Sequence, residues 1–193
     1  MTNALTFILR SVLDLYIITF VLRLVLQWVR ADFRNPLSQF ILRVTNPLVI
    51  PLRRLVPPLG GLDTATLLVV IGLQLIAIVV LVNLACIGTP DIGQWLAMAL
   101  LRLIKLVLQI YFFVILIYVV LSWISPGTYN PAAALLTAIA DPVLAPLRRL
   151  IPPIGGLDLS PVFALIGIQA LTMLLPVGRV MANLVCSSIG YPL

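Results

Sequence analysis

Four long apolar runs constrain this chain more than any other feature of its sequence. They cover approximately residues 6–29, 65–86, 95–124 and 162–186, and each reaches the roughly 20 residues that an α-helix needs to cross a bilayer. Apolar residues make up 62% of the chain and charged residues only 9%, more hydrocarbon than a water-soluble domain of this size can bury. The sequence therefore predicts an all-α membrane protein with four transmembrane helices.

The first apolar run is expected to be a retained span. It is longer than a signal-peptide core, and Asp14 and Arg23 lie inside it. The net charge is +6, but the arginines stand singly or in pairs beside apolar segments and form no solvated basic tract. We therefore expect anionic lipid headgroups as partners and no nucleic acid.

The inventory of reactive side chains predicts no catalysis. The chain contains no histidine and no glutamate, which removes the usual general bases, the common haem ligand and most zinc sites. Its two cysteines, Cys86 and Cys186, are too far apart in sequence for a CxxC redox motif. We predict no enzymatic activity, no cofactor and no metal site.

A repeat at an offset of 95 residues organises the chain. "NPLVIPLRRLVPPLGGLD" at 46–63 recurs as "DPVLAPLRRLIPPIGGLD" at 141–158. The same offset pairs Arg10 with Lys105, Tyr16 with Tyr111, Trp28 with Trp123, Asn35-Pro36 with Asn130-Pro131, and "IGLQ" at 71–74 with "IGIQ" at 166–169. We assign residues 1–94 to the first repeat and 95–193 to the second. Because each repeat holds two spans, an even number, the repeats are predicted to be parallel, with both PLRR stretches on one face of the membrane.

The positive-inside rule predicts which face this is. The first and third loops contain most of the loop arginines, namely Arg30, Arg34, Arg43, Arg53, Arg54, Arg148 and Arg149. The opposite side has Arg10, Arg102, Lys105 and Arg179, several of them within helix ends. The PLRR loops are therefore predicted to be cytoplasmic and both termini to lie outside.

The register of the repeat changes once, in the last span. "NLAC" at 83–86 recurs as "NLVC" at 183–186, an offset of 100, which implies five inserted residues around "LPVGR" at 175–179. Proline and glycine inside a span predict a kink or a break there. The alternative is a helix that surfaces near Pro176 and continues as an interfacial tail.

Each PLRR stretch is predicted to form a short, stiff element at the membrane surface. Before it lies an amphipathic segment, from Asn35 in one repeat and from Asn130 in the other, that is too short to span. Asn46-Pro47 and Asp141-Pro142 have the composition of helix starts. Four residues later come the prolines that would distort the first turn, Pro51 and Pro146. Pairs of prolines and glycines then end the helix and turn the chain.

The arginine doublets are the main candidate site, and two interpretations remain open. Paired arginines beside spans often only anchor topology. Alternatively, one arginine of each doublet pairs with the aspartate that follows, and the other binds lipid phosphate or a protein partner. The candidate residues are Arg53, Arg54, Arg148, Arg149, Asp63 and Asp158.

Polar residues within the spans are further candidates. Arg10 and Asp14 are four apart, as are their counterparts Lys105 and Gln109, so each pair shares a helix face and the first can neutralise itself. Charges inside spans are nevertheless functional candidates by default.

The repeated glutamines and cysteines each leave two interpretations. Gln74 and Gln169 each follow a glycine that permits close helix approach. They are expected to bond neighbouring helices, with an ion path as the alternative. Cys86 and Cys186 occupy matching positions, and we favour two small packing residues over a disulfide.

The two PLRR motifs resemble a known signature. "PLRRLVPPLGGLD" and "PLRRLIPPIGGLD", each preceded by a helix that contains tyrosine and ends near tryptophan, are similar to the YggT family, also called YlmG-like, of bacterial and plastid multi-pass membrane proteins. The similarity covers nearly the whole chain. It implies a bacterial inner (plasma) membrane protein. No single reaction follows, because the roles linked to the family, from osmotic stress and potassium uptake to cell division and plastid cytochrome assembly, share only a membrane location.

Three functional hypotheses follow. The first is a non-enzymatic scaffold or assembly factor in envelope organisation or stress response, whose PLRR elements grip the interface and dock a membrane-protein partner or a second copy. The second is an oligomeric channel or ion-uptake component that uses Arg10, Asp14, Gln74 and Gln169. The third is a regulator that binds anionic lipid through the arginines.

Overall fold

The computed structural model describes residues 2–58, 63–87, 91–124, 130–151, 158–176 and 185–186. In chain order the elements are α1 (Thr2–Trp28), α2 (Pro36–Leu55), α3 (Thr64–Ala85), β1 (Cys86–Ile87), α4 (Ile92–Ile124), α5 (Pro131–Leu150), α6 (Ser160–Leu174) and β2 (Val185–Cys186). The predicted all-α class is confirmed, since the strands within these ranges are one antiparallel pair of two residues each. In that pair the backbone of Cys86 lies opposite that of Cys186.

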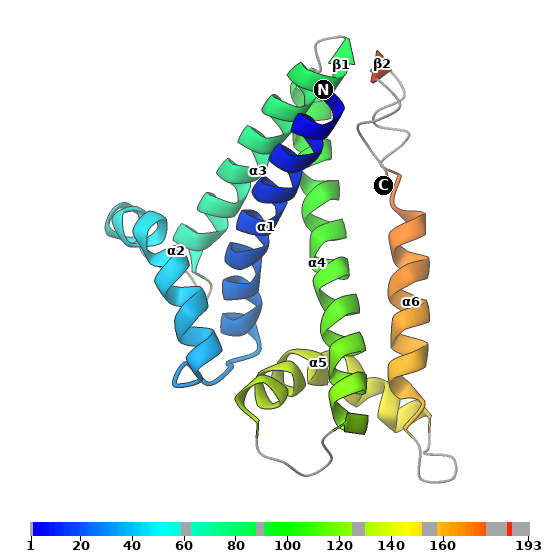
Figure 1. The fold of residues 1–193 in the computed structure, drawn as a ribbon. Coiled ribbons are helices and arrows are strands. Elements are labelled where there is room, and N and C mark those ends of the chain that lie inside the picture. The colour runs from blue at the N-terminus through cyan, green and yellow to red at the C-terminus, as the bar shows by residue number, and fades with distance from the viewer. Residues whose placement is uncertain are drawn as a thin grey trace.

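Each half of the chain folds as two long helices joined by a bent helix. α1 packs on α3 and α2 contacts both, and α4, α6 and α5 have the same arrangement. In Figure 1, α1 and α4 run in one direction and α3 and α6 return in the other. The halves meet where α3 and α1 contact α4 and where α2 contacts α5. At the last junction the Asn35 amide donates a 2.6 Å hydrogen bond to the Pro131 carbonyl.

One helix in the described ranges is both long and apolar enough to cross a membrane. It is α4, through 31 residues from Ile92 to Ser122. The other apolar helical segments found there, Thr64–Val80 in α3 and Ser160–Leu174 in α6, are shorter, and the 27-residue α1 carries three charged side chains. Length and composition therefore support one of the four predicted spans, the one in α4. The other three spans stay predictions.

The elements that contain the PLRR motifs differ from the prediction. α2 and α5 are each one continuous helix of 20 residues, so Asn46-Pro47 and Asp141-Pro142 are not helix starts. The starts lie eleven residues earlier, where the side chains of Asn35 and Asn130 accept hydrogen bonds from the backbone N–H groups of Leu37 and Ala132. This is the normal N-cap arrangement, with proline at the first helical position.

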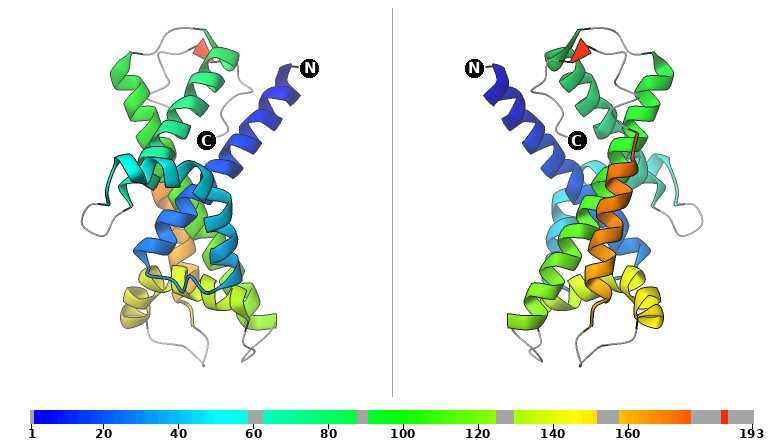
Figure 2. Two further views of the ribbon diagram at one scale, coloured as in Figure 1. Left: turned by 90° about the vertical axis from the view of Figure 1, so that its left-hand side faces the viewer. Right: turned by 90° about the vertical axis from the view of Figure 1, so that its right-hand side faces the viewer.

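Packing explains why both helices continue through their internal prolines. Thr45 and Val49 of α2 lie on either side of Pro47 and are fully buried, as are the equivalent Ala140 and Leu144 of α5. Two turns of each helix are therefore anchored in the protein core, which outweighs the local cost of proline. Bends at prolines relieve the clash with the preceding turn, and Figure 2 shows α2 and α5 bent midway along their length.

The last helix is shorter than the predicted span 162–186. α6 ends at Leu174, and Leu175 has extended backbone angles, φ −63° and ψ 123°. The cause is Pro176, because proline disfavours helical backbone in the residue before it. Residues 177–184, where the inserted segment continues, lie outside the described residues.

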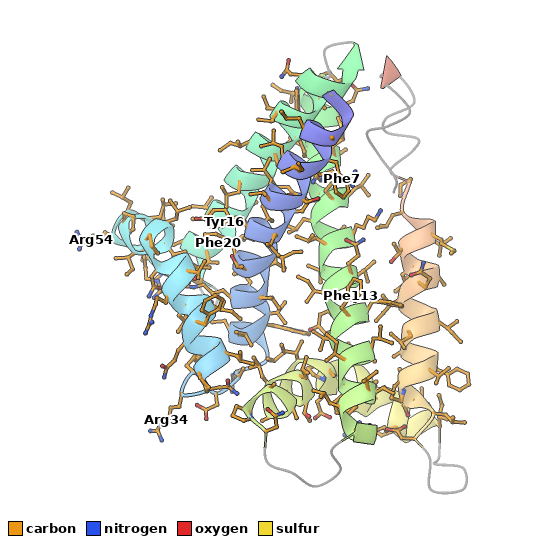
Figure 3. The ribbon with its side chains drawn as sticks, in the orientation of Figure 1. Phe7, Tyr16, Phe20, Arg34, Arg54 and Phe113 are labelled. Atoms are coloured by element: carbon orange, nitrogen blue, oxygen red, sulfur yellow. The ribbon has the colours of Figure 1, made fainter. Side chains whose placement is uncertain are left out.

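The main core lies along α1 and α4 and includes side chains from the other four helices. Its largest fully buried members include Phe20 of α1, Ile115 of α4 and Ile139 of α5. The ring of Tyr16 meets that of Phe20 edge to face, with centroids 5.1 Å apart (Figure 3). A smaller cluster joins Ile78 of α3 to Met98 of α4 nearer the strands. Because the main core includes side chains of α2 and α5, it holds these two bent helices against the bundle.

Candidate functional site

Asp63 is the centre of a buried cluster that ties the first three helices together. We call this the first cluster: Arg23, Thr45, Asn46, Arg53, Asp63 and Thr66. Asp63 immediately precedes α3, and its carboxylate accepts hydrogen bonds from the Thr66 hydroxyl at 2.6 Å and the Thr66 backbone N–H at 3.3 Å. It therefore caps α3 at the end where the helix dipole favours a negative charge.

Two arginines from different helices meet this carboxylate. Arg53, the first arginine of the doublet in α2, donates directly to the Asp63 carboxylate. Arg23 of α1 is buried, with 3% of its surface exposed, and its Nε lies 3.7 Å from Asp63 Oδ2. Arg23 Nη1 also donates to Thr45 Oγ1 at 2.7 Å and to Asn46 Oδ1 at 2.8 Å. The buried charge is thus both paired and hydrogen-bonded, as a buried charge must be.

The charged form of Asp63 is favoured in this setting. Burial alone would raise the pKa of the Asp63 carboxyl, but hydrogen bonds from Thr66 and Arg53 and the charge of Arg53 lower it below its ordinary value of 3.8. The carboxylate is therefore ionised at neutral pH. Its role is that of a fixed counter-ion, not that of an acid or base.

The second PLRR helix builds a related cluster around Arg148. We call this the second cluster: Tyr118, Asp141, Arg148 and Asp158. The Arg148 guanidinium donates to Asp158 at 2.8 Å, to the Tyr118 hydroxyl at 3.0 Å and to Asp141 at 3.1 Å. Its side chain is 34% exposed and that of Asp158 is 39% exposed. Arg53 of the first cluster is also exposed, at 43%, so the clusters differ in the aspartate, which is buried in the first and open in the second, and in the buried Arg23.

The second arginine of each doublet takes no part in its cluster. Arg54 and Arg149 are exposed, and within the described ranges no ion pair is found for either of them. Figure 3 shows Arg54 at the outer side of α2, pointing away from the long helices. The structure thus separates the doublets into a bonded arginine, Arg53 or Arg148, and an outward-facing one.

A third charged cluster joins α1 to α4. We call it the α1–α4 cluster: Arg10, Asp14, Arg102 and Lys105. Arg10 Nε lies 3.5 Å from Asp14 Oδ2, so the two residues that are four apart in sequence form an ion pair. Arg102 Nη2 of α4 donates to Asp14 Oδ1 at 2.6 Å. Lys105 lies close enough to interact electrostatically with the three other members. No hydrogen bond between Lys105 and Gln109 occurs in the part of α4 that the structure describes.

The two repeated glutamines lie in different surroundings. Gln74 is buried in α3, whereas Gln169 is exposed on α6. Glycine spacing places them alike on their own helices, but α4 lies between α3 and α6 (Figure 1). The backbones of Cys86 and Cys186 face each other, while the prediction about their side chains falls outside the described residues.

Two arginines of these clusters, Arg23 and Arg102, were not among the residues predicted for the site. Arg23 has a tyrosine, Tyr118, at the matching position of the second repeat, so the repeat comparison does not single it out. Arg102 was predicted only as a charge on the outer side. An arginine inside an apolar run needs a carboxylate partner, and with no glutamate in the chain this rule indicates that Arg23 pairs with one of the six aspartates, without singling out Asp63. Among the described residues, no group of three or more metal-ligating side chains is found.

Comparison with known proteins identifies relatives over most of the chain. The model of the CCB3/YggT family matches residues 2–84 and again residues 97–179. The chain is 44% identical over 175 residues to the uncharacterized protein PA0392 of Pseudomonas aeruginosa, covering 90% of this chain and 89% of that protein. It is 40% identical over 171 residues to the uncharacterized protein YggT of Escherichia coli, covering 89% and 88%.

A shorter match connects the chain to a plastid protein. It is 40% identical over 68 residues to YlmG homolog protein 2, chloroplastic, of Arabidopsis thaliana, covering 34% of this chain and 26% of that protein. No solved structure matches the chain. Two matches to one family model, together with relatives aligned over nearly nine-tenths of their length, show that the chain belongs to the CCB3/YggT family.

Proposed function

We propose that the protein is a non-enzymatic, four-span membrane protein that acts as a scaffold or assembly factor in envelope organisation or stress response. The carrying observation is the division within each arginine doublet. Arg53 and Arg148 are bonded to aspartates that precede the next helix, while Arg54 and Arg149 are exposed and have no ion pair in the described ranges. A helix fixed in place by one cation and presenting another is suited to docking on phosphate or on an acidic partner.

The surface of the long helices supports four spans. Large apolar side chains are exposed on α1, α3, α4 and α6; they include Phe7, Leu15, Leu68, Phe113 and Phe163. Water would disfavour so much exposed hydrocarbon, whereas lipid solvates it. The charges of α1 do not oppose insertion, because Arg23 and Asp14 both have partners.

The bent helices α2 and α5 would lie at the cytoplasmic interface in this proposal. Arginines near span ends favour that side, and anionic headgroups there attract them. A reporter active only in the cytoplasm, fused after Leu193, should be inactive, and the same reporter inserted after Arg54 should be active. The reverse pattern would overturn the orientation while leaving the four spans intact.

The charge arrangement favours a scaffold over an ion path. Asp14 is bonded to two arginines and Asp63 to two more, so neither carboxylate is free to bind a passing cation. Potassium flux into liposomes that contain only this protein, abolished by Asp14→Asn, would instead establish the ion-uptake hypothesis.

The docking role is tested by comparing loss of the outward-facing arginines Arg54 and Arg149 with loss of two other exposed arginines. Photo-cross-linking in native membranes should recover fewer partners with Arg54→Gln/Arg149→Gln than with the unchanged protein. The matched control is Arg34→Gln/Arg43→Gln, which removes two other exposed charges, both in the first repeat, and should keep the cross-links. Equal recovery with both variants would contradict a docking role for Arg54 and Arg149.

A further inference from the structure

The α1–α4 cluster lies in the half of the bundle that is farther from α5. Its members belong to the N-terminal halves of α1 and α4, and these halves lie at the end away from α5 (Figure 1). Two cations of α4, Arg102 and Lys105, here face a single carboxylate that is also bonded to Arg10. Like-charged groups this close require a counter-anion if the segment is to stay in a membrane.

One atom of this cluster indicates where such an anion would bind. The Arg102 side chain is 12% exposed, and its Nη2 is bonded to Asp14. Its Nη1 is buried and has no hydrogen-bond partner among the described residues. A buried guanidinium N–H without an acceptor is costly, and a phosphate oxygen is an acceptor that suits guanidinium geometry.

An apolar groove begins one helical turn from these cations. It has a volume of about 260 Å³ and is lined mainly by Ile18, Leu22, Leu106, Ile110, Phe113 and Ile117. Phe113 is 57% exposed and Ile117 is 46% exposed, so the groove is open along its side. It lies between α1 and α4, and therefore between the two repeats.

Helix geometry makes the charged cluster and the groove continuous. On α1, Asp14 is followed at spacings of four by Ile18 and Leu22, and on α4, Lys105 is followed by Gln109, Phe113 and Ile117. Successive residues spaced by four are neighbours along a helix surface and form a slightly inclined row, and α1 and α4 run in the same direction (Figure 1). From Lys105 to Ile117 the helix rises about 18 Å, comparable with one leaflet of a hydrocarbon core about 30 Å thick.

We propose that this site binds one anionic phospholipid, with its phosphate on Arg102 and Lys105 and an acyl chain in the groove. The inference rests on α1 and α4 spanning the membrane, as the proposed function requires. A free phosphate would satisfy the cations but leave the groove empty, and an apolar helix would fill the groove but not the cations. A lipid supplies both parts in the observed order, and it would join the repeats as a structural ligand.

The test uses the full chain in detergent and native mass spectrometry during lipid titration. Phosphatidylglycerol should be retained, whereas phosphatidylcholine with identical chains and soluble glycerol phosphate should not. Arg102→Gln/Lys105→Gln should bind phosphatidylglycerol about 30-fold more weakly, since each cation near an anionic headgroup contributes roughly a fivefold step. Arg34→Gln/Arg43→Gln removes the same charge at exposed positions elsewhere and should bind normally.

A second variant tests the groove without altering the charges. Ile117→Trp fills the far end of the groove at a partly exposed position and should weaken retention while leaving thermal unfolding unchanged. Equal retention of both lipids, or normal binding by Arg102→Gln/Lys105→Gln, would overturn the lipid site. A dimer that Ile117→Trp dissociates would assign the groove to a second copy instead. Extraction of membranes with alkaline carbonate distinguishes failure of the lipid site from failure of the proposed function. A protein without membrane spans would be released by carbonate, whereas a spanning protein without the lipid site would stay in the membrane.

Discussion

The first and second clusters occupy equivalent positions in the repeat but differ in burial and charge. Arg23 and Asp63 are nearly inaccessible, whereas Arg148 and Asp158 are about one-third exposed. At the 95-residue offset, Arg23 corresponds to Tyr118 and Asn46 to Asp141. The first cluster thus sets two arginines around one carboxylate, and the second sets two carboxylates and a phenol around one arginine.

This difference shows how one motif supports two degrees of rigidity. A buried ion pair holds its helices firmly because separating it leaves a charge without solvent. An exposed pair is screened by water and salt and contributes little. The first repeat therefore fixes α1, α2 and α3 to one another, while α5 is held mainly by its packing against α4 and α6.

Loss of the central carboxylate should separate the clusters most clearly. Asp63→Asn leaves Arg23 buried without a counter-charge and should lower the free energy of unfolding by about 3–5 kcal/mol. The matched Asp158→Asn should lower it by about 1 kcal/mol or less. Thermal or denaturant unfolding in detergent, followed by helical circular dichroism, measures both. Similar losses would show that burial does not distinguish the clusters.

Exchange of the diverged residue is the next test. Arg23→Tyr places the second repeat's residue in the first cluster and removes the donor to Thr45 and Asn46. Asp63 keeps Arg53 and Thr66, so the expected loss is about 1–3 kcal/mol, the range for an unsatisfied buried polar group. The same unfolding assay applies, with Arg54→Gln as the control. A loss as large as that of Asp63→Asn would mean that Arg23 alone anchors the aspartate.

The sequence predicted the long helices better than the bent ones. Apolar runs and proline signals located α1, α3 and α4 to within a few residues, because burial in a span depends on composition over many residues. The continuous α2 and α5 were missed because two buried turns override what Pro47 and Pro51 favour locally. That competition depends on tertiary contacts of Thr45 and Val49, which no local pattern encodes.

The candidate site was predictable where the repeat preserved it and not elsewhere. Both doublets and both following aspartates recur at one offset, which made an arginine–aspartate pair one of the two interpretations of the sequence. Arg23 and Arg102 have no charged counterpart at the matching positions, since Tyr118 and Phe7 stand there. Their roles arise from contacts between helices, Arg102 with Asp14 across the repeats, and sequence spacing does not show such contacts.

A smaller effect is expected from removal of one hydroxyl in the second cluster. Tyr118→Phe deletes the 3.0 Å hydrogen bond from Arg148, and the loss should be about 0.5–1.5 kcal/mol. Tyr111→Phe on the same helix is the control, because the Tyr111 hydroxyl is buried without a partner among the described residues and its removal should be neutral or stabilising. If Tyr111→Phe lowers the free energy of unfolding more than Tyr118→Phe does, the hydrogen bond from Arg148 to Tyr118 does not stabilise the second cluster as expected.

The smallest effect should come from mild acid, and its sign follows from the lowered pKa values of both aspartates. Burial opposes ionisation of Asp158 as it does of Asp63, but the hydrogen bond from Arg148 and those from Ser160 lower the pKa of Asp158 below 3.8. A lowered pKa in the folded state contributes stability that is complete above the unfolded value and is lost only as pH falls through the folded value.

Unfolding free energy should therefore change by less than about 0.1 kcal/mol per aspartate between pH 7 and pH 5, and should fall below about pH 4. Asp63→Asn should flatten the acid limb more than Asp158→Asn, because protonation of Asp63 strands the buried Arg23. A transition between pH 5 and pH 7 that Asp63→Asn abolishes would mean that burial outweighs the hydrogen bonds and raises the pKa of Asp63. The first cluster would then hold α1, α2 and α3 together in a pH-dependent way.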